Sequence, residues 1–139
     1  MSRHYGRAVA LGAAFSTTMF SLAFLVVAGL LKMLSSQIEA GQSRPNYTFG
    51  IRSKATLASE EAWVAAHETS LKILKGTTIF LLGCTAALWV LFTVLPKDDA
   101  SVPVIFFSGL GFIAILVVLL MRMYLKADAV ATKIGSATK

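Results

Sequence analysis

The sequence predicts an all-α integral membrane protein, with three transmembrane helices and an amphipathic cytoplasmic helix that leads into the second span. Three observations predict this fold class. Hydrophobic residues make up 56% of the 139 residues and charged residues only 14%, which is not the composition of a soluble domain. Three uncharged runs are each long enough to cross a bilayer. A single long polar segment separates the first run from the second, and we expect residues 1–139 to form one membrane domain.

The first predicted span covers residues 8–31, which contain no charged side chain. At about 1.5 Å rise per residue, a helix of this length crosses a hydrocarbon core of roughly 30 Å. The run is longer than the apolar core of a secretory signal, so we expect a retained helix. Small residues at helical spacing on one side predict a face for close helix packing. They are Ala10, Ala14, Thr17, Ser21 and Ala28. The alternative is that this spacing reflects only the ordinary composition of a membrane span.

The polar segment is predicted to form a motif loop over residues 42–75. Gly41 and Pro45 mark its beginning, since glycine weakens a helix and proline has no N–H to donate. Gly50 is expected where the backbone needs a positive φ angle or closely approaches the membrane face. Arg52 carries a guanidinium suited to a carboxylate, a lipid phosphate or the carbonyls at a helix end. An ordinary basic loop residue beside anionic lipid explains Arg52 equally well from composition alone.

A helix is expected to start near residue 57 and to lead into the second span. Thr56 or Ser59 is predicted to cap this helix by accepting hydrogen bonds from free backbone N–H groups. Glu60 and Glu61 then occupy the first turn, where the helix dipole favours negative charge. The residues that follow have an apolar face at helical spacing, which predicts an amphipathic lead-in. Whether the lead-in and the second span form one continuous helix stays open.

The lead-in contains two aromatic side chains and a charge pair. Trp63 is expected to anchor the helix among the lipid headgroups. His67 has no cysteine, histidine or carboxylate at metal-ligand spacing, so we expect a polar residue of the membrane interface and not a metal ligand. Glu68 and Lys72 are four residues apart, in the favourable order for an ion pair on a helix.

The second and third spans are predicted at residues 76–95 and 103–121, joined by a short polar hairpin bracketed by prolines. Gly83 and Ala87 form a small-residue step on the second span and predict a contact face. Small residues on the third span mark a close approach or a bend. They are Ser108, Gly109 and Gly111.

The remaining features of this half are assigned no chemistry. Arg122 and Lys126 end the third span, and their long side chains can reach the membrane surface. Cys84 is the single cysteine and lies inside the second span, so no internal disulfide is predicted. The tail, residues 127–139, is expected to be short and weakly helical.

One stretch of the polar segment, NYTFGIRSKATLASEEAWVAAH over residues 46–67, resembles the signature of the SdpI-like family of bacterial membrane proteins. In that signature an asparagine precedes an aromatic residue, glycine, isoleucine, arginine and a threonine or serine. These precede a threonine, a serine or asparagine, a tryptophan and a polar or basic residue one helical turn later. Ile51 and Ser53 match this signature, as do eight further residues that we predict to form the site for a partner. These eight are Asn46, Phe49, Gly50, Arg52, Thr56, Ser59, Trp63 and His67. The resemblance implies a short, three-span member of the family in the bacterial plasma membrane.

The resemblance also implies a function. The namesake of the family is an immunity protein that protects its producer from a secreted toxic peptide and also signals to a repressor. A similar role here implies immunity or envelope signalling through the motif, whose residues bind a partner or fix the loop. Arg52 is expected to form a polar cluster with Asn46, Thr56, Trp63 and His67.

The distribution of basic residues predicts the orientation in the membrane. With three spans, the N-terminus and the hairpin share one side, and the motif loop and the C-terminus share the other. The first side has three basic residues, which are Arg3, Arg7 and Lys97. The second side has the other ten of the thirteen. The positive-inside rule therefore places the N-terminus outside and the motif loop and C-terminus in the cytoplasm.

No enzyme is predicted, because the sequence shows no nucleophile with a base, no metal shell and no converging acid and base groups. We therefore expect no catalytic residue, metal site or cofactor. Expected partners are the lipid bilayer, other membrane proteins or further copies of the chain, and a peptide ligand, whereas the dispersed basic residues argue against nucleic acid. The alternative function is an accessory subunit that stabilises a larger transporter, synthase or respiratory complex. A membrane enzyme or lipid-headgroup binder that uses Arg52 and His67 is the least favoured hypothesis.

Overall fold

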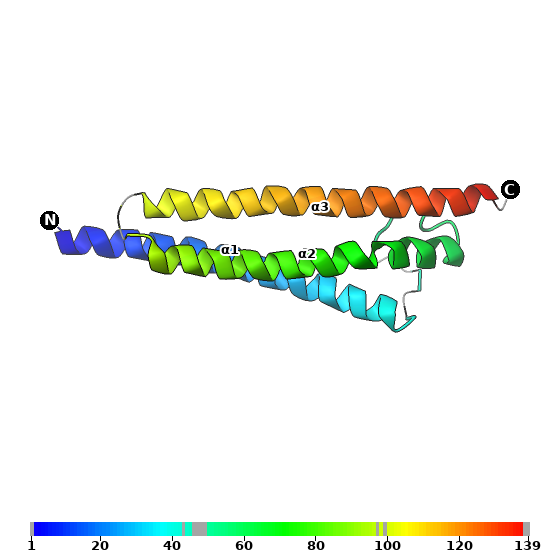
Figure 1. Ribbon diagram of the computed structural model, residues 1–139, viewed down its shortest axis with the longest axis horizontal. Coiled ribbons are helices and arrows are strands. Elements are labelled where there is room, and N and C mark those ends of the chain that lie inside the picture. Colours follow the sequence, from blue (N-terminus) through cyan, green and yellow to red (C-terminus); the bar gives the residue numbers. More distant parts are fainter. Residues whose placement is uncertain (1, 43, 46–49, 97, 99, 138–139) are drawn as a thin grey trace. The chain divides into compact units, whose positions relative to one another are not determined.

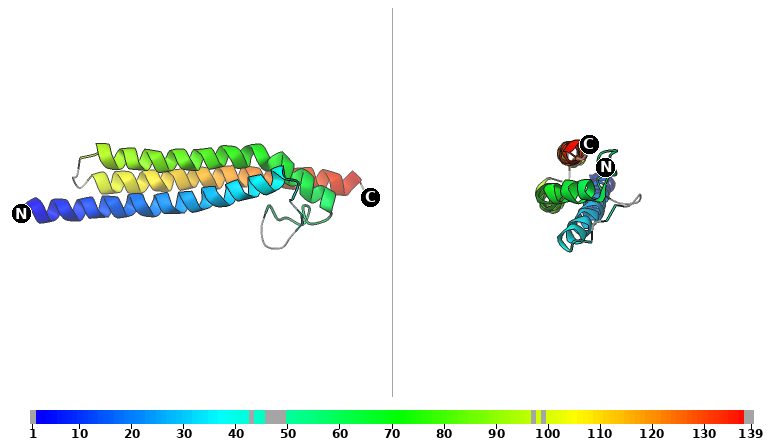
Figure 2. Two further views of the ribbon diagram at one scale, coloured as in Figure 1. Left: turned by 90° about the horizontal axis from the view of Figure 1, so that it is seen from below. Right: turned by 90° about the vertical axis from the view of Figure 1, so that its right-hand side faces the viewer.

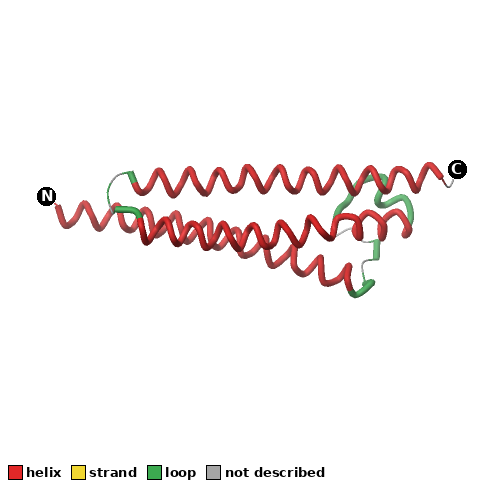
Figure 3. Tube along the Cα trace, in the orientation of Figure 1, coloured by secondary structure: helices red, strands yellow, loops and turns green. Residues whose placement is uncertain are grey.

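The computed structural model describes residues 2–42, 44–45, 50–96, 98 and 100–137. Most of this part lies in three long helices, α1 (Ser2–Glu39), α2 (Glu60–Val94) and α3 (Ser101–Ala137) (Figure 1). The rest of the described chain forms loops and turns, and no strand occurs among the described residues (Figure 3). Each helix is long and apolar enough to cross a membrane. The predicted fold class, an all-helical protein with three spans, is confirmed.

All three helices extend beyond the uncharged runs in the sequence. Helix α2 runs without a break from Glu60 to Val94, so the polar lead-in and the second span are one helix. The tail, expected to be only weakly helical, is part of α3 as far as Ala137. An existing helix gains one hydrogen bond for each residue added and needs no new nucleus, so it continues through alanine- and lysine-containing sequence after the apolar run ends.

The chain divides into two compact units, each built from parts of all three helices. Unit 1 comprises Met1–Ala28 and Ile79–Leu116, and unit 2 comprises Gly29–Thr78 and Val117–Lys139. The described part of the polar motif, residues 50–67, lies entirely in unit 2.

Aromatic contacts hold the helices of unit 1 together, where they run side by side (Figure 2). The ring centroids of Phe20 and Phe106 are 5.8 Å apart, which joins α1 to α3. Phe112 of α3 lies 6.4 Å from Phe24 of α1 and 6.4 Å from Phe80 of α2, with edge-to-face geometry in both pairs. Such pairs are favoured because the positive edge of one ring meets the negative face of the other.

Small residues in unit 1 allow this close packing. A Cβ atom added at Gly109 would lie 2.5 Å from Cδ2 of Phe20, so the predicted close approach on α3 is confirmed at this glycine. A Cβ atom at Gly111 or at Gly83 would meet no described atom within 4 Å. Of the small residues predicted to form a packing face on α1, three are buried and two are partly exposed. The buried ones are Thr17, Ser21 and Ala28.

The outer surfaces of the helices carry large apolar side chains. Leu11 is 70% exposed and Ile79 is 71% exposed, and many others on all three helices are similarly uncovered. A soluble protein does not leave this much apolar surface in water, whereas a bilayer covers it with lipid tails. The exposure therefore agrees with three membrane-spanning helices.

In unit 2, an ion pair joins α1 to α2. The Nζ atom of Lys75 on α2 donates to a carboxylate oxygen of Glu39 near the end of α1, and both side chains are partly exposed. The pair expected within α2, Glu68 with Lys72, does not form in the described structure. Lys75 instead bridges two helices, a contact that spacing along one helix cannot predict.

Candidate functional site

Residues 50–59 fold back onto the first turns of α2. Ser59 ends the loop, since its Oγ accepts a hydrogen bond from the backbone N–H of Ala62 at 3.1 Å and its carbonyl accepts from the N–H of Trp63 at 3.1 Å. Ser59 is thus the N-cap of α2. The helix begins at Glu60, three residues later than predicted, and Glu60 and Glu61 occupy its first turn as expected.

Thr56 does not cap α2, although it was predicted as an alternative to Ser59 for that role. Its side chain is fully buried, and its Oγ1 accepts from the backbone N–H of Ser53 at 2.8 Å while lying 3.0 Å from the carbonyl oxygen of Ile51, to which it donates. In return, the N–H of Thr56 donates to Oγ of Ser53 at 3.1 Å. These bonds satisfy polar groups inside the protein and fix a tight turn before the helix.

His67 attaches this turn to the helix through both ring nitrogens. Nδ1 lies 2.8 Å from the carbonyl oxygen of Trp63, and because a carbonyl can only accept, Nδ1 carries the proton. Nε2 accepts a hydrogen bond from the backbone N–H of Ile51 at 3.0 Å. Because Nε2 accepts this bond, the ring is the neutral Nδ1–H tautomer, and its full burial favours the uncharged form.

The surroundings of His67 agree with this neutral form. Burial lowers the pKa of His67 below its ordinary value, and the hydrogen bond to the Trp63 carbonyl opposes this effect only in part. His67 precedes the uncharged run that starts at Gly76, in a part of α2 that charged side chains keep out of the hydrocarbon. Those side chains are Glu61, Glu68, Lys72 and Lys75. Among the described residues no group of His, Cys, Asp or Glu side chains could hold a metal ion.

Trp63 and Gly50 complete the contact. The rings of Trp63 and His67 stack with centroids 4.1 Å apart, and Trp63 is 1% exposed. Gly50 has a φ angle of 119° and lies over both rings: an added Cβ would be 2.7 Å from Nε2 of His67 and 3.0 Å from two ring carbons of Trp63. The prediction of a positive φ at Gly50 is confirmed, and the surface it approaches is this ring pair. The expectation that Trp63 anchors the helix among headgroups is wrong, because its ring is inside the protein.

We call this arrangement the motif clamp. It consists of Gly50, Ile51, Ser53, Thr56, Trp63 and His67. Ile51 and Ser53 were not among the predicted site residues, because one takes part through its backbone N–H and carbonyl and the other completes a turn. The serine–threonine spacing of three residues is a signal in the sequence that indicates such a turn.

Arg52 lies on the outside of the clamp. Its neighbours Ile51 and Ser53 are buried, while Arg52 and Lys54 are exposed, so side chains alternate between the interior and the surface. Arg52 makes no hydrogen bond or ion pair with any described residue. The predicted cluster is thereby divided into an interior set and an outward guanidinium. Asn46 and Phe49 lie outside the described residues.

Comparison with known proteins shows the family to which the chain belongs. Residues 42–122 match the family model described as the SdpI/YfhL protein family, and this match covers more than half of the 139 residues. It includes the whole motif clamp, all of α2 and most of α3. No curated protein and no solved structure matches the chain.

Proposed function

Because the chain belongs to the SdpI/YfhL protein family, we propose that it is a non-catalytic bacterial membrane protein that acts in peptide-toxin immunity or envelope signalling through the motif clamp. The observation that carries this proposal is the division of the motif. The clamp uses the buried polar groups of Ser53, Thr56 and His67 internally, whereas the guanidinium of Arg52 is exposed and free to meet a partner. Arg52 is therefore the contact residue for a partner.

The chemistry of Arg52 suits a binding role. A guanidinium offers five donors in a planar fork, which matches a carboxylate on a peptide or on a partner protein. The backbone on both sides of Arg52 is fixed by the hydrogen bonds of Ile51 and Ser53. A fixed backbone loses less conformational entropy on binding than a mobile loop, so more of the contact energy appears as affinity.

A non-catalytic role agrees with the state of the most reactive side chain in the motif. Both nitrogens of His67 are engaged in hydrogen bonds to the backbone, and the ring is closed off from solvent. A general acid or base must reach a substrate proton directly or through one water molecule. His67 in this arrangement supports the loop.

The proposal includes an orientation. The positive-inside rule, applied to three basic residues on the side of the N-terminus and ten on the other, places the N-terminus outside the bacterial plasma membrane. The motif clamp and the C-terminus then lie in the cytoplasm. Arg52 and Lys54 would meet their partner there, which favours a signalling contact or an inner-face step of immunity.

The second candidate function is an accessory subunit of a larger membrane complex. Gly83 is exposed, Ala87 one turn later is partly exposed, and a Cβ at Gly83 would meet no described atom within 4 Å. This small-residue step on α2 is open to a helix of another protein, and small residues let membrane helices approach closely.

Protection of a sensitive bacterial host tests the preferred function. The host expresses the protein and is challenged with a panel of membrane-active peptide toxins. We expect the protein to raise the inhibitory concentration of at least one peptide, and Arg52→Gln to reduce this protection about tenfold, as loss of one charge-assisted contact would. Lys133→Gln is the matched control, because it removes an exposed charge from α3 far from the motif in sequence. Full protection by the Arg52 variant would contradict the role of this side chain.

Purification from the native membrane in mild detergent separates the two candidates. Sizing and mass spectrometry of the tagged protein identify what accompanies it. A single large membrane protein in fixed stoichiometry would favour the accessory subunit. Isolation alone or as a homo-oligomer, together with protection that depends on Arg52, supports immunity or signalling.

A further inference from the structure

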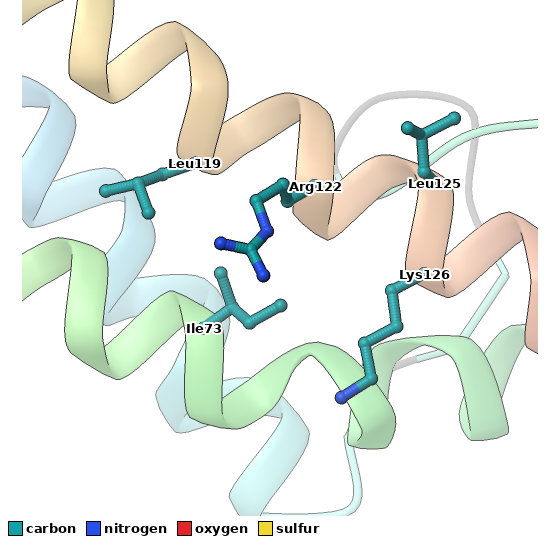
Figure 4. A pocket seen from close by; sticks show the side chains of 5 residues that line it. All are labelled: Ile73, Leu119, Arg122, Leu125 and Lys126. Carbon is teal, nitrogen blue, oxygen red and sulfur yellow. The ribbon is translucent and has the colours of Figure 1, made fainter.

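Unit 2 contains a pocket between α2 and α3 that is separate from the motif clamp. Its volume is about 590 Å³. The guanidinium of Arg122 lies beside Ile73 of α2, and the amine of Lys126 extends from α3 toward α2 (Figure 4). The walls are otherwise apolar and come from Ile73, Leu119 and Leu125. The pocket therefore joins two cations to an apolar surface.

The two cations lack an internal counter-charge. Neither Arg122 nor Lys126 forms an ion pair or side-chain hydrogen bond with a described residue. They are four residues apart on one helix, and like charges at this spacing repel each other. An anion placed between them would remove this repulsion, and a phosphate would also accept paired hydrogen bonds from the guanidinium.

The position of the pocket along the sequence indicates where this anion comes from. Arg122 is the first charged residue after an uncharged run of 22 residues, 100–121, and Ile73 lies three residues before the uncharged run of α2. The pocket is thus at the edge of the hydrocarbon, the depth at which lipid phosphates lie. Lys126 is about 6 Å farther along the axis of α3, toward the headgroups.

We propose that this pocket binds one anionic phospholipid, with its phosphate between Arg122 and Lys126 and the start of an acyl chain against the apolar wall. The volume is within the roughly 300–1,000 Å³ of small-molecule sites. Basic pockets between membrane helices are suited to anionic headgroups. A free phosphate ion would gain nothing from Ile73, Leu119 and Leu125, so a lipid fits the walls better than a soluble anion.

Native mass spectrometry of the protein in mild detergent tests the site. The protein is mixed with equal amounts of phosphatidylglycerol and phosphatidylcholine that have identical acyl chains. We expect wild-type protein to retain phosphatidylglycerol about tenfold more strongly, and Arg122→Gln with Lys126→Gln to abolish this preference. The control double variant, Lys32→Gln with Lys133→Gln, removes two exposed helix charges that do not line the pocket and should keep the preference.

The other outcomes overturn the proposal. Equal retention of both lipids by wild-type protein would overturn it, and this test does not depend on the correct folding of any variant. An equal loss of preference in both double variants would show a general effect of charge and no site. Displacement of the bound lipid by millimolar glycerol phosphate or inorganic phosphate would assign the pocket to a soluble anion. None of these results depends on Arg52, so failure here leaves the toxin-protection test untouched.

Discussion

Gly50 is a position in the motif clamp where a side chain does not fit. Its φ angle of 119° lies in a region that side chains rarely adopt, and the rings of His67 and Trp63 fill the space where a Cβ would go. Strain and overlap together lead us to expect that Gly50→Ala lowers the free energy of unfolding by about 2–4 kcal/mol. Thermal unfolding in detergent measures this change, and amide hydrogen exchange at Ile51 reports the loss of its bond to His67.

Gly41 provides a matched control for this prediction. It also has a positive φ angle, 65°, but a Cβ added there meets no described atom within 4 Å. Gly41→Ala should therefore cost only about 1 kcal/mol of backbone strain. If the two alanine variants were equally destabilised, contact with the ring pair would not be the reason for glycine at position 50.

At the residue scale, local chemistry was predictable and long-range contacts were not. The N-cap at Ser59 and the special backbone at Gly50 follow from preferences of single residues. The burial of His67 depends on the N–H of Ile51, which is 16 residues away in the sequence. No periodicity within α2 encodes that contact, so a polar residue expected at the interface is found inside the protein.

At the scale of helices, the packing of α1 against α3 depends on Gly109. A Cβ at this position would lie within 2.7 Å of three ring atoms of Phe20, and that ring is held between Phe24 and Phe106. Because the ring cannot move aside freely, we expect Gly109→Ala to destabilise the protein by about 1–3 kcal/mol, seen as a lower melting temperature in detergent.

Two companion variants define this effect. Gly111→Ala adds the same methyl group to α3 where no described atom is within 4 Å, so it should leave stability unchanged or raise it by up to about 1 kcal/mol through helix propensity. The double variant Gly109→Ala with Phe20→Ala should lose less stability than the sum of the two single losses, because Phe20→Ala removes the atoms that clash. Additive losses would argue against direct contact between these positions.

The existence and type of all three helices were predictable, since uncharged runs of membrane length leave few other structures for the backbone. The residues at which the helices begin and end were harder to predict. Ser59 moves the start of α2 to Glu60, and α3 continues to Ala137 because its polar end still favours a helix. Composition marks where the hydrocarbon ends and says less about where the hydrogen-bonded helix ends.

At the scale of the whole molecule, three spans require the motif clamp and the short hairpin to lie on opposite sides of the membrane. Lys54 beside the clamp and Asp98 in the hairpin are both exposed. In a Cys84→Ser background, we expect a membrane-impermeant maleimide to label Asp98→Cys in intact cells, and Lys54→Cys only after the membrane is opened. This outcome follows from the excess of basic residues beside the motif.

The reverse labelling pattern would keep three spans and invert the proposed orientation. Labelling of both positions from the same side would contradict a crossing of the membrane by α2, the helix that separates them in the sequence. The Cys84→Ser protein without an added cysteine is the background control, because Cys84 is the single native cysteine and is buried.

The unbroken course of α2 has a mechanical consequence. A helix of 35 residues is a rod about 50 Å long, stiff to twisting because each turn is tied to the next by hydrogen bonds. His67 and Trp63 are on the same rod as Trp89, which is 44% exposed in the apolar run. The hydrogen bond from Ile51 to His67 therefore attaches the loop to the same continuous helix that carries the apolar run.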